Sequence, residues 1–370
     1  MQFDAIIVGG GVIGLSIARE LVRAKLKVCI IEKDKLGAGT SSIAAGGLPP
    51  HYDPGTTSAA FLELCSASRD LFPQLVEDLK REVGFAPDYQ QNGSLYVVMD
   101  AADWPEVEAR VAGNQSLNYP VERVAKEDLT EFEPNISPYA LGGLFYPGDH
   151  HVETDVYVRA LVAACQNSGM NIFEGTTVEE VLVKAGHVEG VRTSLGTFYA
   201  PTVVNCAGAL AGKIPGVESL PVFPTKGQGI RVQSHSGPIA SRIIFSSGCY
   251  MVPRPNNAMW VGATKEPHVD TPYQTLGPLL DVLNITSAIL PIIRDCEIQK
   301  MVFGFRPTLP DHMPVIGESS IVGGLYHAFG HYALGILLSP ITAKIIGALV
   351  TGQIVTFDLA PLRPDRFQSV

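Results

Sequence analysis

The first part of the chain alternates apolar runs with a glycine-rich break, a pattern that predicts two buried strands around a helix. Residues 1–8 form a short apolar run typical of a buried strand, and residues 15–24 have an apolar helical pattern. Residues 27–31 form a second buried strand that ends at Glu32. The break, residues 9–14, has the sequence GGGVIG and fits G-x-G-x-x-G, so the pattern predicts one βαβ unit.

The rest of the chain continues to alternate between helical periodicity and short strand-like runs. The expected helices are 58–80 with a kink at Pro73, 156–165, 276–290 and a long buried helix at 333–350. The expected strands are 89–99 with a turn at Asn92-Gly93, 172–173, 177–183, 188–193 after a turn at Gly186, 203–206, and several within a β-rich stretch from 226 to 265. Because βαβ-type elements occur at the start, middle and end, we expect an α/β protein with a second domain inserted into the first.

The glycines and the acid of the first βαβ unit are the residue types that a dinucleotide site needs. Gly9 allows the tight turn after the strand, Gly11 lets the backbone approach a pyrophosphate, and Gly14 lets the helix pack on the strand. Phosphates are favoured at the helix N-terminus, where N–H groups and the helix dipole attract negative charge. Glu32 is placed to accept hydrogen bonds from ribose hydroxyls. The unit therefore predicts a bound dinucleotide rather than a purely structural turn.

Composition and charge narrow the classes of partner and compartment. The 370 residues are 46% hydrophobic and 17% charged, as in ordinary globular proteins, and the net charge of −10 argues against a nucleic-acid partner. The most apolar stretch, 333–350, contains Ser339, Pro340, Thr342 and Lys344, so we expect a buried helix and no transmembrane segment. We expect no signal peptide, because the N-terminus lacks a basic region. Six cysteines without a C-x-x-C pair predict free thiols, no metal site and a cytoplasmic location.

Segments spread along the chain carry a resemblance to a known family. They are the N-terminal βαβ unit; Thr40-Ser41-Ser42 with Ala45-Gly46-Gly47; Val203 to Ala209; Gly248 to Arg254 with Val261 to Thr264; and Gly304 to Pro307 with Pro314 to Gly317 and Gly330-His331. In this order they resemble the D-amino-acid oxidase superfamily of flavoproteins, and within it the glycine oxidases.

The resemblance implies a fold, a cofactor and a reaction. It implies a Rossmann-type, glutathione-reductase-like FAD-binding domain with an inserted α+β substrate domain built on a mixed or antiparallel sheet. The FAD-binding domain is expected at 1–85, 145–225 and 298–370, and the substrate domain at 86–144 and 226–297. FAD is expected to be non-covalent. The implied reaction is oxidation of glycine or another small amine or amino acid by hydride transfer from Cα to flavin N5. Imine hydrolysis gives an oxo acid and ammonia, and dioxygen reoxidises the flavin to give hydrogen peroxide.

Four residues are expected to take part in catalysis or substrate binding. Arg306, in Gly-Phe-Arg-Pro, matches the family arginine that grips the substrate carboxylate with two parallel hydrogen bonds, and Tyr250 matches the tyrosine that assists it. Lys265 is expected as a buried cation that activates oxygen near flavin N5, with a solvated lysine as the alternative. His331 is either catalytic or a loop histidine held by hydrogen bonds.

The cofactor-binding residues implied by the resemblance come from all three parts of the FAD-binding domain. The backbone N–H groups at about 331–335, opening the last helix, are expected to face the flavin pyrimidine edge. Simple strand-end packing is the alternative for Ala207 and Gly208. The full set is Gly9, Gly11, Val12, Ile13, Gly14, Glu32, Lys33, Thr40, Ser41, Ser42, Ala45, Gly46, Gly47, Leu48, Val178, Ala207, Gly208, Gly330, His331, Tyr332, Ala333, Leu334 and Gly335.

Ala333 departs from the glycine oxidases, which commonly carry an arginine there. The sequence Gly330 to Gly335 ends in Leu-Gly, closer to the pattern of D-amino-acid dehydrogenases, and this favours a more apolar substrate. Two alternatives therefore stay open: a D-amino-acid, D-proline or hydroxyproline dehydrogenase that passes electrons to a quinone, and a subunit whose partner chain takes the electrons. Glycine-oxidase relatives also imply a homotetramer and a role in thiamine biosynthesis.

Overall fold

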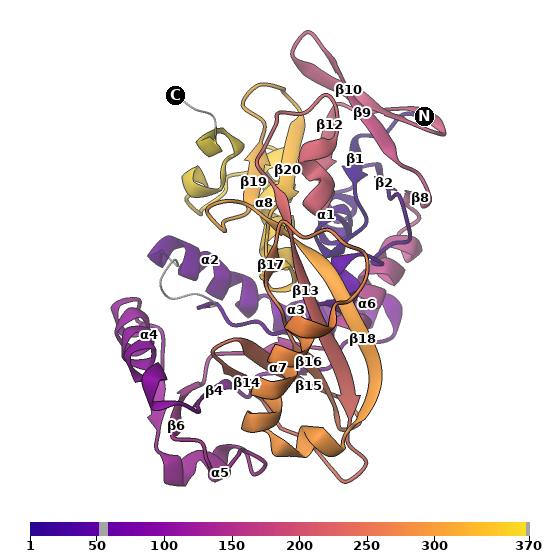
Figure 1. Cartoon of the computed structure of the whole chain (residues 1–370). Coiled ribbons are helices and arrows are strands. Elements are labelled where there is room, and N and C mark those ends of the chain that lie inside the picture. Colours follow the sequence, from indigo (N-terminus) through magenta and orange to yellow (C-terminus); the bar gives the residue numbers. More distant parts are fainter. Residues whose placement is uncertain (52–57, 368–370) are drawn as a thin grey trace.

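The computed structural model describes residues 1–51 and 58–367 and is organised around a six-stranded sheet. Neighbouring strands run parallel, except that β19 is antiparallel to β20. Segments from the start, middle and end of the chain lie side by side in it (Figure 1), which confirms the expected α/β fold class. Across the sheet the order is β19 (Val315–Glu318), β20 (Leu325–Phe329), β12 (Thr202–Asn205), β1 (Ala5–Val8), β2 (Val28–Ile31) and β8 (Asn171–Phe173).

Alternation along these strands supplies two hydrophobic cores, one on each face of the sheet. On β1, Ile7 packs with the helices and Ile6 packs with a three-stranded sheet on the opposite face. This double burial is why residues 5–8 are all apolar. The helical layer consists of α1 (Val12–Arg23), α2 (Ala59–Asp70), α3 (Phe72–Val83), α6 (Thr154–Asn167) and α8 (Gly335–Val350); the other layer consists of β9 (Val178–Lys184), β10 (His187–Thr193) and β11 (Gly196–Tyr199).

The single kinked helix expected over 58–80 is two helices. The chain breaks at Leu71, between α2 and α3, and Pro73 lies in the first turn of α3. Proline is tolerated there because its missing N–H would have no partner within the helix. The proline therefore starts a new helix, and α3 continues to Val83, where Gly84 ends it in a left-handed conformation.

The second large sheet has nine strands and is mostly antiparallel. Helix α7 (Leu276–Ile289) packs on it, and its core joins Leu279 and Val282 to Ile230 and Met251 of the strands. The order is β17 (Glu266–Pro267), β13 (Phe223–Gln233), β16 (Ala258–Gly262), β15 (Cys249–Arg254), β14 (Ile243–Ser246), β4 (Ser94–Val98), β6 (Gly142–Tyr146) and β5 (Glu122–Val124), with β18 (Glu297–Thr308) on the other side of β13.

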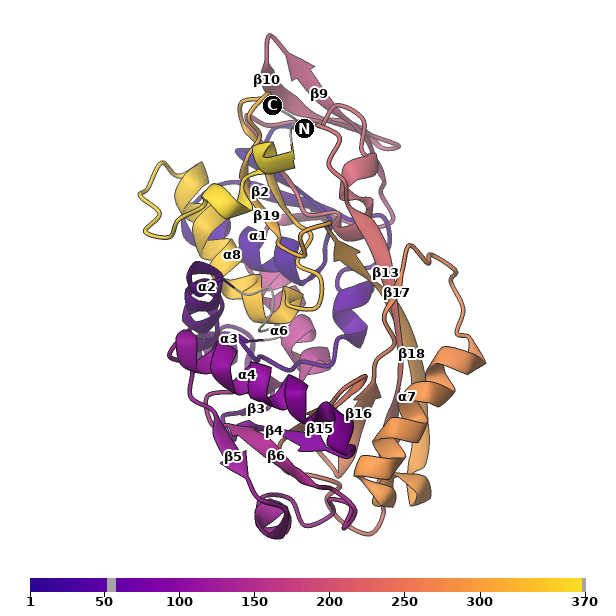
Figure 2. The ribbon, with the colours of Figure 1, turned by 60° about the vertical axis from the view of Figure 1, so that its left-hand side comes forward.

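Several elements of this region differ from the expectation. The run 89–99 is two strands of different sheets, because β3 (Tyr89–Gln90) pairs with β7 (His151–Val152) while β4 pairs with β6 and β14. The turn at Asn92-Gly93 separates them. Helix α4 (Trp104–Ser116), seen in front in Figure 2, was not expected, and neither was the short α5 (Leu129–Phe132). The expected domain boundaries stay a prediction.

The longest strands of the molecule, β13 and β18, form one antiparallel ribbon. Figure 1 shows it running from the nine-stranded sheet towards the six-stranded sheet. Its register pairs Thr225 with Arg306 and Gly227 with Gly304. The ribbon therefore carries residues of the second sheet to the edge of the first. In the part of the chain that the structure describes, no helix is long and apolar enough to cross a membrane.

Candidate active site

A cavity of about 1610 Å³ lies between the two large sheets. It begins at the carboxyl ends of β1 and β2, at Gly9 and Glu32, and extends to Tyr250 and Arg306 on the second sheet. The carboxyl ends of parallel strands are where α/β folds bind ligands. The cavity therefore has a nucleotide end and a substrate end, and nearly all of the expected site residues line it.

Three glycines at the nucleotide end are needed for different reasons. Gly9 has φ +105°, and a Cβ there would lie 2.6 Å from the Cys206 carbonyl oxygen. A Cβ on Gly14 would lie 2.0 Å from the Gly9 carbonyl oxygen, and Gly14 does not line the cavity, so it serves helix packing. Gly11 does line the cavity, and a Cβ there would meet only Ser41 Oγ, at 3.3 Å. The strand, turn and helix thus have the shape that a pyrophosphate requires.

The polar groups around this turn are fixed by the protein itself. Helix α1 starts at Val12 without a side-chain cap, and the Val12 N–H donates to Ser41 Oγ at 3.0 Å. The Glu32 carboxylate accepts from the N–H groups of Gly10 (2.7 Å) and Asp34 (2.8 Å). These bonds orient Glu32 in the cavity wall, where it can accept hydrogen bonds from a ribose.

Residues 40–48 form the next part of the wall, and they divide into lining and supporting residues. Ala45, Gly46 and Gly47 line the cavity, as do Thr40 and Ser41. Ser42 and Leu48 do not. Ser42 Oγ donates to the carbonyls of Ala38 and Gly39, and Leu48 is fully buried, so the cofactor contacts expected for both are replaced by structural roles.

A buried arginine that was not predicted from the sequence stabilises this wall through hydrogen bonds to its backbone. Arg254 donates to the carbonyl oxygens of Ala45 (2.6 Å), Ala44 (3.3 Å) and Val152 (3.0 Å), and to Thr154 Oγ1 (3.0 Å). Burial lowers the pKa of Arg254 to about 10. The signal in the sequence is the spacing Tyr250–Val252–Arg254, which puts all three on one face of β15.

On the opposite wall, Lys33, Val178, Ala207 and Gly208 line the cavity, as expected, and so do residues 331–335. Gly330 does not line it: its φ is +81°, and a Cβ there would lie 2.3 Å from Leu309 Cδ1. The backbone N–H groups of Tyr332 and Leu334 donate to Pro307 (2.9 Å) and His331 (2.8 Å). Two of the groups expected to face a flavin are therefore used within the protein.

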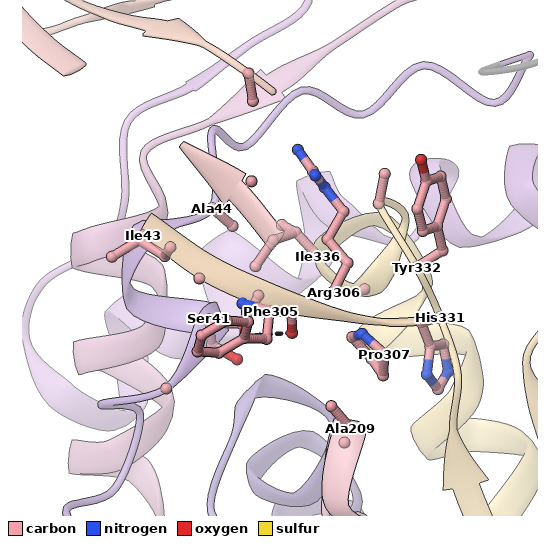
Figure 3. Close-up of a pocket in the computed structure, with 18 of the residues that line it drawn as sticks. Ser41, Ile43, Ala44, Ala209, Phe305, Arg306, Pro307, His331, Tyr332 and Ile336 are labelled. Carbon is pink, nitrogen blue, oxygen red and sulfur yellow. Dashed lines mark hydrogen bonds between the residues drawn. The ribbon is translucent and has the colours of Figure 1, made fainter. Parts of the chain in front are cut away.

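His331 supports the loop rather than the chemistry. It is buried, and its Nε2 lies 3.1 Å from Thr342 Oγ1 of α8. Burial lowers its pKa to about 3, so the imidazole is neutral at pH 7. In Figure 3 its side chain projects away from that of Arg306. These observations favour the alternative of a loop histidine held by a hydrogen bond.

Arg306 is the buried cation of the substrate end. It lies on β18, and its Nη1 donates to the carbonyl oxygen of Thr264 at 3.0 Å. The guanidinium lies over Gly227, where a Cβ would be 2.5 Å from Nη1 and 2.7 Å from Cζ. Its Cζ is 5.9 Å from the ring centroid of Tyr332, and the two side chains project to the same side in Figure 3. A rigid planar donor in a cavity wall is suited to a carboxylate.

Tyr250 lines the same end of the cavity and is held by a neighbouring ring. It stacks on Trp260, with centroids 5.2 Å apart and planes 19° apart. Trp260 Nε1 in turn donates to the carbonyl oxygen of Ile43 at 3.1 Å, which ties this aromatic pair to the cofactor wall. The stacking fixes the plane of Tyr250 and so the direction of its hydroxyl.

Lys265 lines the cavity and is exposed in this structure, whereas a buried cation was expected. An oxygen-activating cation gains its strength from a site that excludes water, and an exposed ammonium is screened. The structure thus favours the alternative of a solvated lysine. Ala333 lines the cavity too, and its methyl group leaves this position without charge.

Comparison with known proteins identifies the relatives of this arrangement. The glycine oxidase of Geobacillus kaustophilus is 33% identical over 97% of this chain and 96% of that protein, and its crystal structure has a TM-score of 0.94 with both chains fully covered. The Bifunctional protein ThiO/ThiG of Trichormus variabilis is 34% identical over all of this chain and 56% of that protein. The Hydrogen cyanide synthase subunit HcnC of Pseudomonas aeruginosa is 28% identical over 99% of this chain and 96% of that protein.

The residues at the nucleotide end fit FAD. The glycine turn leaves open backbone at the N-terminus of α1, Glu32 is oriented for a ribose, and the cavity continues past Gly47 to Arg306. The model of the family described as FAD dependent oxidoreductase (DAO) matches residues 4–349. The chain therefore belongs to the DAO family of FAD-dependent oxidoreductases, and it is a flavoenzyme of the glycine-oxidase type.

Proposed function

We propose that this enzyme oxidises glycine or another small amino acid or amine to the imine, which water then hydrolyses to an oxo acid and ammonia. The observation that carries the proposal is the Arg306 guanidinium, buried over Gly227 at the substrate end of the cavity. A buried guanidinium selects a substrate with a carboxylate, because that group supplies both the charge and the paired acceptors.

In this mechanism the protein binds and orients the substrate. Arg306 holds the carboxylate, and Tyr250 donates a second hydrogen bond to it. These contacts fix the direction of the Cα–H bond, which is the main contribution of a positioned site. Bound FAD supplies the two-electron oxidation. His331 is neutral and directed away from Arg306, so it is not assigned the role of taking the amine proton.

The identity of the substrate depends on the substrate end of the cavity. The similarity to the Geobacillus glycine oxidase supports glycine and oxygen as substrates, and the similarity to ThiO/ThiG supports a place in thiamine biosynthesis. Ala333 leaves one wall uncharged, which favours a D-amino acid with an apolar side chain and supports the dehydrogenase as the second candidate. The similarity to HcnC supports a third candidate, an enzyme that passes electrons to a partner subunit.

Anaerobic bleaching of the bound flavin tests these candidates directly. Glycine, sarcosine, D-alanine, D-proline and larger D-amino acids are mixed in turn with the FAD-loaded protein, and air is then readmitted. Fast bleaching by glycine or sarcosine followed by fast reoxidation, with hydrogen peroxide released, is the expected result. Bleaching only by larger D-amino acids with slow reoxidation would instead establish the dehydrogenase, and reoxidation only after a partner chain is added would establish the third candidate.

The role of Arg306 has its own test. Arg306→Ala should raise KM for amino acids about a hundredfold, because a charge-assisted pair is lost, and should change KM much less for amines without a carboxylate. Arg306→Lys keeps the positive charge but not the planar pair of N–H donors, so a KM between those of the wild type and Arg306→Ala is expected. Equal loss for both kinds of substrate would remove the carboxylate role from Arg306.

A further inference from the structure

The segment that follows β16, residues 264–275, contains β17, which pairs with β13 in the sheet, and it is also bonded to side chains on the face of β13 that lies away from Arg306. On β13, Gly227 faces the guanidinium, so the neighbouring side chains of Lys226 and Gln228 point to the opposite face. Both are fully buried. Lys226 Nζ donates to Thr271 Oγ1 at 3.1 Å, which fastens the middle of the segment.

Gln228 fastens both ends of the segment with its side-chain amide. Its Nε2 donates to Glu266 Oε1 at 2.7 Å and to Thr275 Oγ1 at 2.8 Å, and its Oε1 accepts from the Thr275 N–H at 2.7 Å. A buried amide with three such bonds has one orientation, because any rotation leaves a polar group unsatisfied.

Thr264 connects this network to the substrate end. Its N–H donates to the Gln228 carbonyl oxygen at 3.1 Å, and its Oγ1 accepts from the Gln228 N–H at 2.9 Å. The same Oγ1 donates to Glu266 Oε1 at 2.5 Å. Glu266 therefore accepts hydrogen bonds from both Thr264 and Gln228, and these bonds hold the two side chains in fixed positions relative to each other.

The fastened group is the acceptor that orients Arg306. Arg306 Nη1 donates to the carbonyl oxygen of Thr264, at 3.0 Å, from the other face of β13. We propose that Gln228 and Glu266 are positioning residues, which hold the Thr264 carbonyl where it sets the guanidinium for a substrate carboxylate. This inference rests on the proposed role of Arg306. It adds that the geometry around Arg306 is set by Gln228, which is buried and does not line the cavity, and by Glu266, which lines the cavity beside Thr264.

The test measures carboxylate binding separately from turnover. The probe is glycolate, titrated into the FAD-loaded protein and followed by the change in flavin absorbance. Gln228→Ala and Glu266→Ala should each weaken glycolate about tenfold or more, because displaced groups bind poorly even when they remain present. Glu266→Gln keeps an acceptor for Thr264 and Gln228, so it should restore affinity to within about threefold of wild type. Gln233→Ala, at the exposed end of the same strand, should leave affinity unchanged.

The outcomes separate this inference from the proposed function. If Arg306→Ala abolishes glycolate binding while Gln228→Ala and Glu266→Ala do not weaken it, the positioning role of Gln228 and Glu266 is wrong. The carboxylate-binding role of Arg306 would then be supported. A Glu266→Gln variant as weak as Glu266→Ala would also overturn it, because charge and not hydrogen bonding would then be decisive. If Arg306→Ala binds glycolate normally, the carboxylate-binding role of Arg306 in the proposed function is wrong, and the positioning role that rests on it is wrong too. Should Gln228→Ala not fold, the Glu266 pair of variants decides the question alone.

Discussion

The two ends of the cavity are built in opposite ways. The turn and acid of the nucleotide end come from neighbouring residues, since residues 9–14 and Glu32 belong to one βαβ unit, and backbone groups supply much of this part of the site. The substrate end joins Gly227, Tyr250 and Arg306 from three strands and Thr264 from the loop after β16. A site formed by backbone groups that are close in sequence is disturbed by any added side-chain atom. A site formed by side chains from distant strands depends instead on the register of those strands.

The register of β13 and β18 shows why the second kind is demanding. Thr225 is opposite Arg306 and Gly227 is opposite Gly304, which places the guanidinium over Gly227, a residue without a side chain. A shift of one residue would turn Arg306 to the other face of the sheet. Substitutions at each end can sharpen this contrast, and they are taken here from the largest expected effect to the smallest.

At the nucleotide end, Gly14→Ala should abolish FAD binding and destabilise the fold by several kcal/mol. Its Cβ would lie 2.0 Å from a backbone oxygen, which cannot move without separating α1 from β1. Absorbance of the purified protein and thermal unfolding measure both effects. The matched control is Gly277→Ala, a helical glycine with nothing within 4 Å of its Cβ position, which should bind FAD normally. Normal flavin content in Gly14→Ala would contradict the packing role.

At the substrate end, Gly227→Ala should leave flavin content intact and raise KM for amino acids about tenfold to a hundredfold. The new methyl would occupy the space of the guanidinium, 2.5 Å from Arg306 Nη1. A double-mutant cycle measures whether the loss goes through Arg306. In the Arg306→Ala background the same change should have little effect on KM, and additive losses would mean that Gly227 acts elsewhere.

Arg254 connects the two ends, and Arg254→Met should weaken FAD about tenfold while the protein still folds. It removes the donors that fix the carbonyls of Ala44 and Ala45, and the wall they belong to loses its shape. Titration of the apoprotein with FAD gives the dissociation constant. Arg231→Met removes a nearby charge that pairs with Asp155 instead, so it should change FAD affinity by less than about threefold. If both variants weakened FAD binding equally, the loss in Arg254→Met would be due to the removed charge and not to the lost hydrogen bonds.

The smallest effect expected near neutral pH is at His331, and it grows as the pH is lowered. Its pKa is lowered to about 3 in the folded chain, so the unfolded chain binds the extra proton between pH 6.5 and 3. The free energy of unfolding should therefore decrease as the pH is lowered through this window, by about 1.4 kcal/mol per pH unit from this group. Urea unfolding at several pH values should show a shallower fall for His331→Gln. His150 and His151, with pKa values of about 4, remain as an internal reference.

The sequence predicts the two ends unequally well, and the cause is the same difference in construction. The βαβ unit is a local pattern, so its strands, helix and acid can be found without knowing the fold. Arg306 and Tyr250 were found through the family resemblance and not through spacing. Nothing in their spacing shows that Gly227 lies beneath Arg306, because that contact depends on the pairing of strands about eighty residues apart.

The misplaced elements and residues have physical explanations too. Pro73 marks the start of α3, and a periodicity that continues through α2 and α3 hides the break between them. Lys265 was expected to be buried through the family resemblance, although the strand ends at Gly262 and exposure begins at Lys265, after the buried Ala263 and Thr264. Arg254 was missed because a charged residue at a strand end is ordinarily read as exposed. Its burial depends on a loop two hundred residues away.

The N-terminal half of β18 has a consequence for how the protein behaves in concentrated solution. Residues 297–301 are all exposed, and among residues 1–51 and 58–367 β18 pairs only with β13, so this is an open sheet edge with Ile298 and Met301 on it. Such edges recruit other strands and lead to aggregation unless charge opposes the pairing. Glu297 and Lys300 are the charges available there. Exchange of these two residues for apolar ones would be expected to lower solubility long before it altered the chemistry at the far end of the same strand.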